Sequence, residues 1–368
     1  MKYKGIFLAV LLGGLTGLAG CRKDLCYDHD KHALTANVLL QPEWEKEWER
    51  DYGKGWSDNW PQEYGMEYDE LRSEAATGIA SFVYHQDGSR SERHHPAHGG
   101  ELPMTAGEKS LLLHNDDTRY IVFDGLENSA QATASTRTRT RSTYSELHAD
   151  EKTVNAPDML YGAWIDSYTA VPTQDPTPLA VTMRPLTYTY LIRYEFAQGL
   201  EHVTLARGAL SGMAQSVYLQ NGSTGSQVAT VLFECELKEY GVEVQLSSFG
   251  VPDTPGDHYT RQGGARQNLN LEVMLKNGKL KTFDFDVTDQ LASQPRGGVI
   301  TVGGLTVTDD EAGGDAGFQV EVDDWGPYED IVLPLDGKRN GKTIDKERRT
   351  IRLQLPLDGK RNGKTIKH

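Results

Sequence analysis

The chain is 368 residues long, with 38% hydrophobic and 25% charged residues, and its formal net charge of −15 argues against nucleic acid as a partner. The charge is uneven, because from Asp336 onward eleven Lys plus Arg residues against four Asp plus Glu residues give the tail a charge of +7. The length favours two domains after removal of a leader, at about 150 residues per domain. Beyond the leader, no apolar stretch approaches the roughly 18 residues of a membrane-spanning helix.

The first 20 residues are typical of a secretory signal peptide. Lys2 and Lys4 precede an almost uncharged run, Gly5 to Gly20, which ends in small residues. The sequence Leu18-Ala19-Gly20-Cys21 then resembles a bacterial lipobox, which implies cleavage before Cys21 and attachment of lipid to its thiol and its new amine. Several acyl chains on one residue hold a protein stably on a membrane. The alternative is an ordinary cleaved signal followed by an incidental cysteine.

The other two cysteines, Cys26 and Cys235, are candidates for a disulfide, since an exported protein meets an oxidising compartment. The alternative for Cys235 is a place in a core. In "VATVLFECEL" it shares one face of a predicted strand with Val231 and Phe233, and a cysteine on an apolar face commonly packs as a small hydrophobic residue. Neither thiol has the surroundings of a catalytic nucleophile.

Short segments of alternating apolar and polar residues, separated by turn residues, recur along the mature chain. This pattern predicts an all-β fold of two tandem antiparallel β-sandwich domains. The segments are Ala33–Leu40, Gly78–His85, Ser110–Asn115, Arg119–Gly125, Leu186–Phe196 and Gly298–Asp309.

One stretch after the first of these segments, "PEWEKEWERDYGKGW", has some helical character. Trp44 and Trp48 lie four residues apart and would share a helix face. With Trp56 and Trp60 they form an aromatic cluster, for which one interpretation is a sugar-stacking platform, with Trp44 and Trp48 as the ligand-binding residues. The other is ordinary packing against the edge of a sandwich.

The segment "RHHPAHGG" contains a group of histidines that could ligate zinc or copper: His94, His95 and His98. Pro96 and the paired glycines favour a loop without fixed ligand geometry. A polar turn is therefore the plainer interpretation.

Residues Ser129 to Ser145, "SAQATASTRTRTRSTYS", are almost without apolar side chains and predict a mobile surface loop or a strand edge. Arg137, Arg139 and Arg141 in this stretch lie in a loop of the kind that proteases prefer. The alternative, which we favour, is a basic strand edge that discourages edge-to-edge pairing.

A domain boundary is predicted within "VPTQDPTP", Val171 to Pro178, because three prolines among small polar residues interrupt the strand pattern. The predicted domains are therefore 21–170 and 171–335, preceded by the signal peptide 1–20 and followed by the basic tail 336–368.

In the second domain, "LNLEVMLKNGKLKTFDFDV" predicts a hairpin that turns at Asn277-Gly278. A two-residue turn would place Phe283 opposite Glu272. A three-residue turn with Gly278 as the bulge residue returns Phe283 to the side of Leu271, so we expect the bulged form.

No catalytic constellation is found along the chain. Asp309, Asp310, Glu311 and Asp315 offer oxygen ligands, but their spacing departs from that of calcium loops. Nucleophile elbows, zinc-protease helices and dinucleotide fingerprints are missing from the sequence. We therefore expect no enzyme, with neither catalytic nor metal-binding residues and without a cofactor.

The tail repeats "LPLDGKRNGKTI", at Leu333 to Ile344 and at Leu355 to Ile366. It lacks the spacing of a phosphate-binding loop, which needs four residues between its first glycine and Gly-Lys-Thr. One interpretation is a duplicated strand that docks on a sheet edge. The other, which we favour, is a recent duplication or readthrough extension.

Several segments together carry a resemblance to a known family. They are the lipobox, "DLCYDH", "YHQDG", "LLLHND", "APDMLYG" (Ala156–Gly162), "RGALSGMAQSVYL" (Arg207–Leu219), "FDVTDQL" and "VEVDDWGPYEDIVLPL". In their order and spacing the chain resembles the Bacteroidales lipoproteins related to fimbrial anchor subunits, which tether type V pili to the outer membrane.

This resemblance implies two transthyretin-like β-sandwiches, a lipid on Cys21 and pilin-like subunits as partners. It also implies strand exchange, in which an extended segment of one subunit completes the sheet of another. The function expected is thus a lipid-anchored fimbrial anchor at the outer membrane, on its cell-surface or periplasmic face. The alternative is a cell-surface glycan-binding lipoprotein that uses Trp44 and Trp48.

Overall fold

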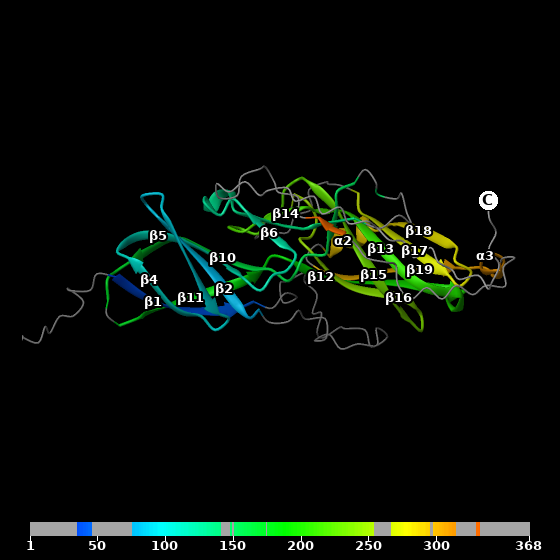
Figure 1. Cartoon of the computed structure of the whole chain (residues 1–368), viewed down its shortest axis with the longest axis horizontal. Helices are drawn as coiled ribbons and strands as arrows, with labels where there is room; N and C mark the ends of the chain where they lie inside the picture. The colour runs from blue at the N-terminus through cyan, green and yellow to red at the C-terminus, as the bar shows by residue number, and fades with distance from the viewer. Residues whose placement is uncertain are drawn as a thin grey trace, which may run out of the picture. The chain divides into compact units, whose positions relative to one another are not determined.

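The computed structural model describes residues 35–45, 76–140, 148, 151–173, 175–253, 266–294, 297–313 and 329–331. Their strands form sheets of seven, ten and three strands (Figure 1). The helical elements are short: η6 (Ser129–Gln131), η7 (Leu200–His202), α2 (Thr288–Ser293) and α3 (Asp309–Ala312). The predicted all-β class is confirmed. None of the helices within the described residues has the length and apolarity to span a membrane.

The seven-stranded sheet folds over on itself into two layers. Its order is β3 (Arg90–Pro96), β2 (Gly78–His85), β5 (Gly107–Asn115), β10 (Tyr161–Ala170), β11 (Thr177–Pro185), β1 (Thr35–Trp44) and β4 (Gly100–Thr105). Alternate residues of β1 face inward, and Ala36, Val38 and Leu40 are each 1% exposed. They pack in one cluster with side chains of β5 and β10 such as Leu113 and Tyr161. The core between the layers therefore follows from the period-2 pattern of the strands.

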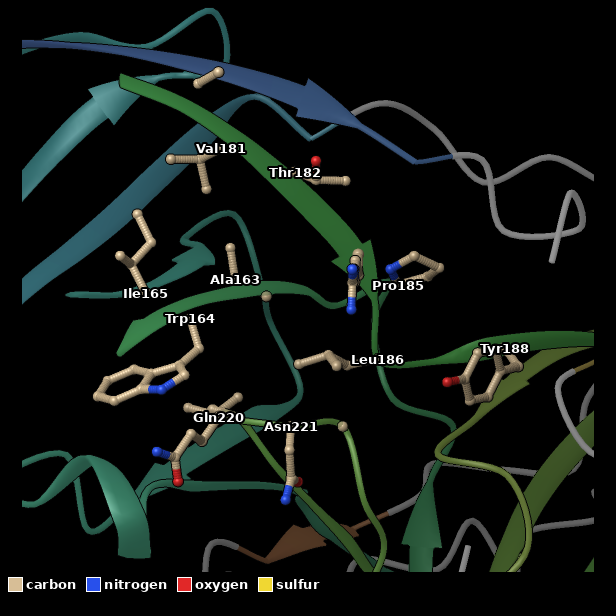
Figure 2. Close-up of a pocket in the computed structure, with 15 residues that line it drawn as sticks. Ala163, Trp164, Ile165, Val181, Thr182, Pro185, Leu186, Tyr188, Gln220 and Asn221 are labelled. Carbon is tan, nitrogen blue, oxygen red and sulfur yellow. The ribbon is translucent and has the colours of Figure 1, made fainter. Parts of the chain in front are cut away.

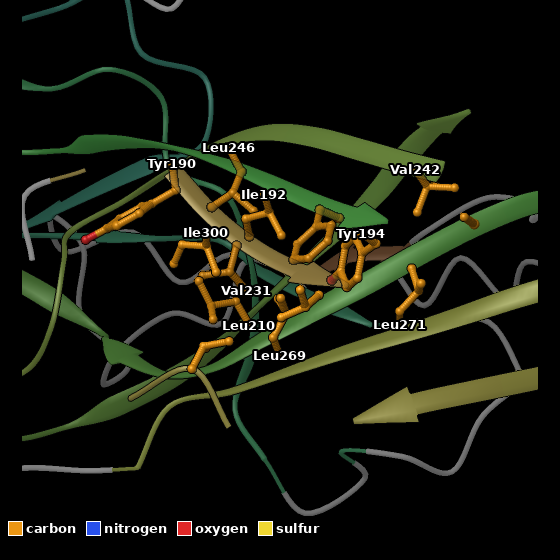
Figure 3. Packing of buried hydrophobic residues seen from close by; sticks show 14 of the residues in the cluster. Tyr190, Ile192, Tyr194, Leu210, Val231, Val242, Leu246, Leu269, Leu271 and Ile300 are labelled. Atoms are coloured by element: carbon orange, nitrogen blue, oxygen red, sulfur yellow. The ribbon is translucent and has the colours of Figure 1, made fainter. Parts of the chain in front are cut away.

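The ten-stranded sheet encloses a second core. Its main path is β18 (Leu280–Asp286), β17 (Asn268–Leu275), β13 (Val203–Ala214), β15 (Val228–Lys238), β16 (Gly241–Ser248), β12 (Tyr188–Gln198) and β19 (Gly298–Thr306). Three short strands lie off this path: β8 (Thr138–Thr140), β9 (Thr153–Asn155) and β20 (Glu329–Ile331). Tyr190, Ile192 and Tyr194 of β12 meet Leu210 and Leu271 in the core (Figure 3).

The three-stranded sheet forms a third apolar layer. It consists of β14 (Ser216–Tyr218), β7 (Thr133–Thr136) and β6 (Ile121–Asp124). Ala134 and Val217 of this sheet belong to a cluster with Phe82 of β2 and Leu112 of β5. The strands β2 and β5 are thus covered on both faces, which explains their continuous apolar runs.

Where it is described, the stretch Ser129–Ser145 forms strands in place of the predicted mobile loop, and β8 pairs on both sides, with β9 and β20, and so is not the predicted strand edge. The stretch contains η6, β7 and β8, and β7 lies between β6 and β14. Threonine and alanine suffice for these strands because tertiary packing decides strand formation more than propensity does. Arg137 precedes β8 and Arg139 lies within it, whereas Arg141 lies outside the described residues.

The predicted boundary at Val171–Pro178 lies between β10 and β11, which both belong to the seven-stranded sheet. In sequence order, the first strand on the main path of the ten-stranded sheet is β12, which follows this segment. The earlier strands β8 and β9 also pair within the ten-stranded sheet. The two-domain division stays a prediction, and the sheets interleave along the sequence.

The helix predicted around Trp44 is wrong where it is described. Pro42 to Trp44 continue β1, paired with Val181 to Met183 of β11. Hydrogen bonding across the sheet outweighs the weak helical spacing, as tertiary context commonly does. Trp48 lies outside the described residues.

The bulged hairpin is confirmed. Leu271 pairs with Phe283 and Leu269 with Phe285, which is the register of a three-residue turn. The turn closes with hydrogen bonds from Gly278 N–H to Leu275 C=O (2.8 Å) and from Leu275 N–H to Lys279 C=O (2.9 Å). Gly278 has φ of 80°, the left-handed conformation that this turn requires.

We expect Gly278→Ala to lower the free energy of unfolding by about 1 kcal/mol, because a Cβ penalises the left-handed conformation. Urea denaturation measures this loss. Gly225→Ala is the control, since a Cβ at Gly225 would meet nothing within 4 Å and its φ lies outside the left-handed range. Equal stability of the two variants would contradict a strained turn.

Candidate strand-docking site

The first strand of the described residues, β1, lies in the middle of a layer. β1 pairs in parallel with β11 from Val38↔Thr177 to Trp44↔Met183. On its other side it pairs antiparallel with β4 from Thr35↔Thr105 to Leu40↔Gly100. Both edges of β1 are therefore occupied, and the layer β11-β1-β4 has its N-terminal strand in place.

The strands β10 and β11 separate soon after they meet. They pair at only two positions, Tyr161↔Pro185 and Gly162↔Arg184. Beyond these, β10 follows β5 in one layer and β11 follows β1 in the other. We call the opening between Gly162–Ala170 and Thr177–Arg184 the wedge. Within the described residues, no strand occupies the facing edges of the wedge, so they present backbone groups of the kind that accept an added strand.

The wedge opens onto the first core. Ala163 and Val181 from its two sides belong to that core, and Ile165 and Leu179 are half-buried against it. A strand placed here would cover apolar side chains in addition to pairing with backbone groups. Side-chain burial and backbone pairing are the two sources of affinity in strand addition.

The base of the wedge is a pocket of ≈ 490 Å³. Figure 2 shows Ala163, Trp164 and Ile165 on one wall and Val181 and Thr182 on the other. A turn following β14 supplies the floor with the amide side chains of Gln220 and Asn221, while Leu186 and Tyr188 complete the lining. The pocket thus combines apolar side chains with polar groups in similar measure, so it offers both apolar contact and hydrogen bonds to a bound segment.

Trp164 is held on the side away from the first core. It joins the third apolar cluster and lies 6.3 Å from the ring of Tyr84, centroid to centroid. The Tyr84 hydroxyl donates to the Leu126 carbonyl at 2.8 Å. Burial raises the pKa of Tyr84 to about 12, so its proton stays in place at neutral pH.

The carboxylate of Asp158 fixes the chain just before β10. One oxygen, Oδ2, accepts from three successive backbone N–H groups: those of Arg119 (2.7 Å), Tyr120, and Ile121 (3.3 Å). A charged acceptor satisfies such donors better than a neutral one does. Asp158 therefore ties the start of β6 to the segment that leads into β10.

Asn115 makes a second tie at the same place. It is 2% exposed, donates to Asp117 (2.7 Å) and to the Met159 carbonyl (2.9 Å), and accepts from the Tyr161 N–H at 2.7 Å. Burial alone would raise the pKa of Asp117, but the hydrogen bonds from Asn115 and Thr77 lower it overall. Asp117 thus stays ionised, and Asn115 links β5 to the segment that leads into β10.

Asp158 and Asn115 were not singled out from the sequence as site residues. They stand in "APDMLYG" and "LLLHND", two of the segments that carry the family resemblance. Their presence in these segments was the only indication in the sequence that they matter. The N–H groups that Asp158 binds come from residues 37 to 39 positions away, so no local pattern predicts the bonds.

The predicted lipidation residue, Cys21, lies outside the described residues, as does Cys26. Cys235 is half-buried and packs against the second core with Val231 and Phe233, as the strand pattern predicted. The disulfide between Cys26 and Cys235 stays a prediction.

Trp44 serves packing in the described fold. Its ring meets Tyr161 edge to face at 4.9 Å, and its Nε1 donates to the Ala97 carbonyl at 3.0 Å. These contacts of Trp44 correspond to the second interpretation of the aromatic cluster, which was ordinary packing in the sandwich. Its proposed companion in sugar binding, Trp48, is outside the described part of the chain.

The histidines of "RHHPAHGG" are engaged locally. His94 binds Asp116 at 2.6 Å and His95 binds Ser81 at 2.9 Å. The bond to Asp116 raises the pKa of His94, whereas burial lowers that of His95. Among the described residues, no three His, Cys, Asp or Glu side chains gather into a metal site.

Comparison with known proteins relates the chain to fimbrial subunits. Residues 66–234 match the model of a domain of unknown function, DUF5119. The chain is 21% identical over 356 residues to Fim4B of Bacteroides ovatus, which is named as a fimbrium anchoring subunit. That alignment covers 89% of this chain and 97% of the relative. The resemblance expected from the sequence is confirmed.

Two solved structures are similar to the chain. A protein assigned as an adhesin from Bacteroides ovatus matches with a TM-score of 0.51 at 16% identity, over 79% of this chain and 95% of that chain. The fimbrial anchor protein Mfa2 from Porphyromonas gingivalis matches with a TM-score of 0.41 at 10% identity, over 73% and 90% of the two chains. The first match supports a shared β-sandwich architecture.

We expect Asp158→Ala to lower the free energy of unfolding by about 2–3 kcal/mol, because it leaves partly buried N–H groups without an acceptor. Asp158→Asn, which keeps an oxygen, should lose less. Asp87→Ala is the matched control, since Asp87 accepts from Ser89 in an exposed turn. Chemical denaturation compares them, and a loss at Asp158 no larger than that at Asp87 would contradict the structural tie.

Proposed function

We propose that this protein is a lipid-anchored fimbrial anchor subunit of the outer membrane that engages pilin subunits by β-strand addition. The occupied position of β1 is the observation that carries the proposal. The match to an anchoring subunit over almost the whole length of that relative gives the fimbrial role its independent support.

An anchor must transmit force from its lipid to its folded body. Cys21, the proposed lipidation residue, precedes β1 by a short segment, so tension on the lipid acts along β1. This strand is paired on both sides over Val38 to Leu40, with β11 and with β4. A pull along the strand therefore loads backbone hydrogen bonds on both edges together. The buried side chains of Ala36, Val38 and Leu40 add a second resistance, since withdrawal would expose them to water.

The retained strand also limits how this chain exchanges strands. A subunit that has lost its first strand can accept a replacement at that position, whereas here β1 already fills it. Addition at the wedge is compatible with an intact β1, because the facing edges of β10 and β11 lie away from it. An extended segment of a pilin subunit would pair with one of these edges and cover Ile165 and Leu179.

Recovery of partners from outer-membrane fractions tests the proposal. We expect the wild-type chain to bring down pilin-like subunits, identified by mass spectrometry, in complexes that resist boiling. Cys21→Ala should leave the membrane fraction, because the proposed lipid is its attachment. Ile165→Arg should recover at least about tenfold less pilin, because it buries a charge under the added strand.

Val171→Arg is the matched control for the wedge variant. Val171 is 61% exposed in the connection between β10 and β11, so an arginine there should leave recovery unchanged. Equal recovery by Ile165→Arg would contradict docking at the wedge. A wild-type chain that recovers polysaccharide-uptake proteins and no pilins would contradict the anchor function and favour glycan binding.

A further inference from the structure

The outer edge of β19 is covered by side chains of a helix. β19 pairs with β12 on one side, and within the described residues no strand pairs with its other side. Gln290 of α2 donates from Nε2 to the Thr301 carbonyl and accepts the Thr301 N–H on Oε1, both at 3.0 Å. Gln294, which caps α2, makes the same two bonds with Val299, both at 2.8 Å.

These four bonds reproduce the pairing of a β-strand. A primary amide carries one donor and one acceptor side by side, as a peptide group does. Four residues along a helix rise about 6 Å, and two residues along a strand rise about 6.6 Å. Gln290 and Gln294 are therefore spaced to meet Thr301 and Val299 in antiparallel order. We call this pair of side chains the glutamine guard.

The guard is held in position by the core and by a glycine. Leu291, between the two glutamines, is 0% exposed and belongs to the second core. Gln294 is itself 8% exposed. A Cβ on Gly298 would lie 2.2 Å from Gln294 Oε1, so the absence of a side chain there lets the amide lie against the strand.

The strand under the guard lacks the usual protection of an edge. Strands at sheet ends commonly carry charges or prolines that prevent pairing with another molecule. The other three strands at the ends of the main paths of the two large sheets carry them: Arg90, Glu92 and Arg93 on β3, Glu101 and Pro103 on β4, and Lys281, Asp284 and Asp286 on β18. β19, "GVITVGGLT", has neither a charge nor a proline. Its β-branched run Val299 to Val302 is of the type that pairs readily.

We propose that Gln290 and Gln294 close the β19 edge against strand addition, and that the occupant they exclude is β19 of a second copy of this chain. Two copies of one edge can pair antiparallel about a two-fold axis, which satisfies both at once. The guard is uncharged and does not titrate, so the edge stays closed irrespective of pH. This inference does not depend on the fimbrial role.

The test is the mass of the full chain in solution, produced with Cys21→Ala to avoid lipid. The double variant Gln290→Ala/Gln294→Ala removes the four amide hydrogen bonds to the edge, and we expect light scattering after size-exclusion chromatography to report about twice the wild-type mass. Gln86→Ala is the control, because Gln86 bonds only an exposed Glu108 side chain at 3.2 Å and should leave the chain a monomer. A folded double variant that stays monomeric overturns the proposal.

A rescue variant distinguishes edge pairing from general aggregation. Thr301 follows the buried Ile300 and so points away from the core, and Thr301→Lys places a charge beside the exposed edge. We expect Thr301→Lys in the double variant to restore the monomer. Association that persists in this triple variant overturns the assignment to β19.

Hydrogen exchange on the wild-type chain keeps the proposal testable if the double variant fails to fold. The amides of Val299 and Thr301 should exchange as slowly as that of Ile300 between them, although no strand among the described residues covers their side. If the amides of Val299 and Thr301 exchange as fast as an exposed turn amide such as that of Ser89, the proposal that the glutamine guard closes the edge is overturned.

Discussion

Backbone N–H and C=O groups at the edges of its sheets are the constraint on which the structure of this protein depends. Each such group must be paired, shielded or left for a partner, because an unmet buried polar group is costly. The chain meets this requirement differently at each edge. The end strands β3, β4 and β18 carry charged residues or proline. The side-chain amides of Gln290 and Gln294 bind the edge of β19, and β1 is paired on both sides. The wedge between β10 and β11 is where two facing edges are left without a strand in the described part of the molecule.

The wedge exists because consecutive strands belong to different layers. β10 stays with β5 and β11 crosses to β1, so the two can pair only where the layers meet. A polar network marks that meeting point. Asp158 collects three backbone N–H groups, and Asn115 donates two hydrogen bonds and accepts one, which leaves the short segment before β10 little conformational freedom. A buried polar network of this kind favours one arrangement of the chain, because breaking it would leave buried polar groups unpaired.

Strand addition and protection against strand addition are two outcomes of the same chemistry. Under the proposed function, the chain would bind its partner by backbone pairing and would have to avoid pairing with a second copy of itself. The distribution of charges, proline, glutamine amides and open edges describes how one chain can satisfy both requirements. It also gives a structural role to polar residues of the segments that carry the family resemblance: "LLLHND" supplies Asn115, "APDMLYG" supplies Asp158, and "FDVTDQL" supplies Gln290.

Period-2 alternation, which is local, determined the all-β class, the inward face of β15 with Cys235, and the bulged turn at Gly278. The register of that hairpin followed from requiring Phe283 and Leu271 to share a face, a condition that two neighbouring segments can meet alone. The strand identity of Pro42 to Trp44 could not be predicted in this way, because it depends on β11, which lies far along the chain.

Only the tertiary structure decided where β10 and β11 part, which N–H groups Asp158 binds, and that Gln290 and Gln294 lie along β19. Each of these features depends on contacts between separate segments, and neither segment contains a local pattern that predicts the contact. A glutamine on a short helix looks the same whether it faces water or the edge of a strand. The amino-acid sequence alone determined the elements with a repeating pattern, and long-range packing decided how their unpaired edges are used.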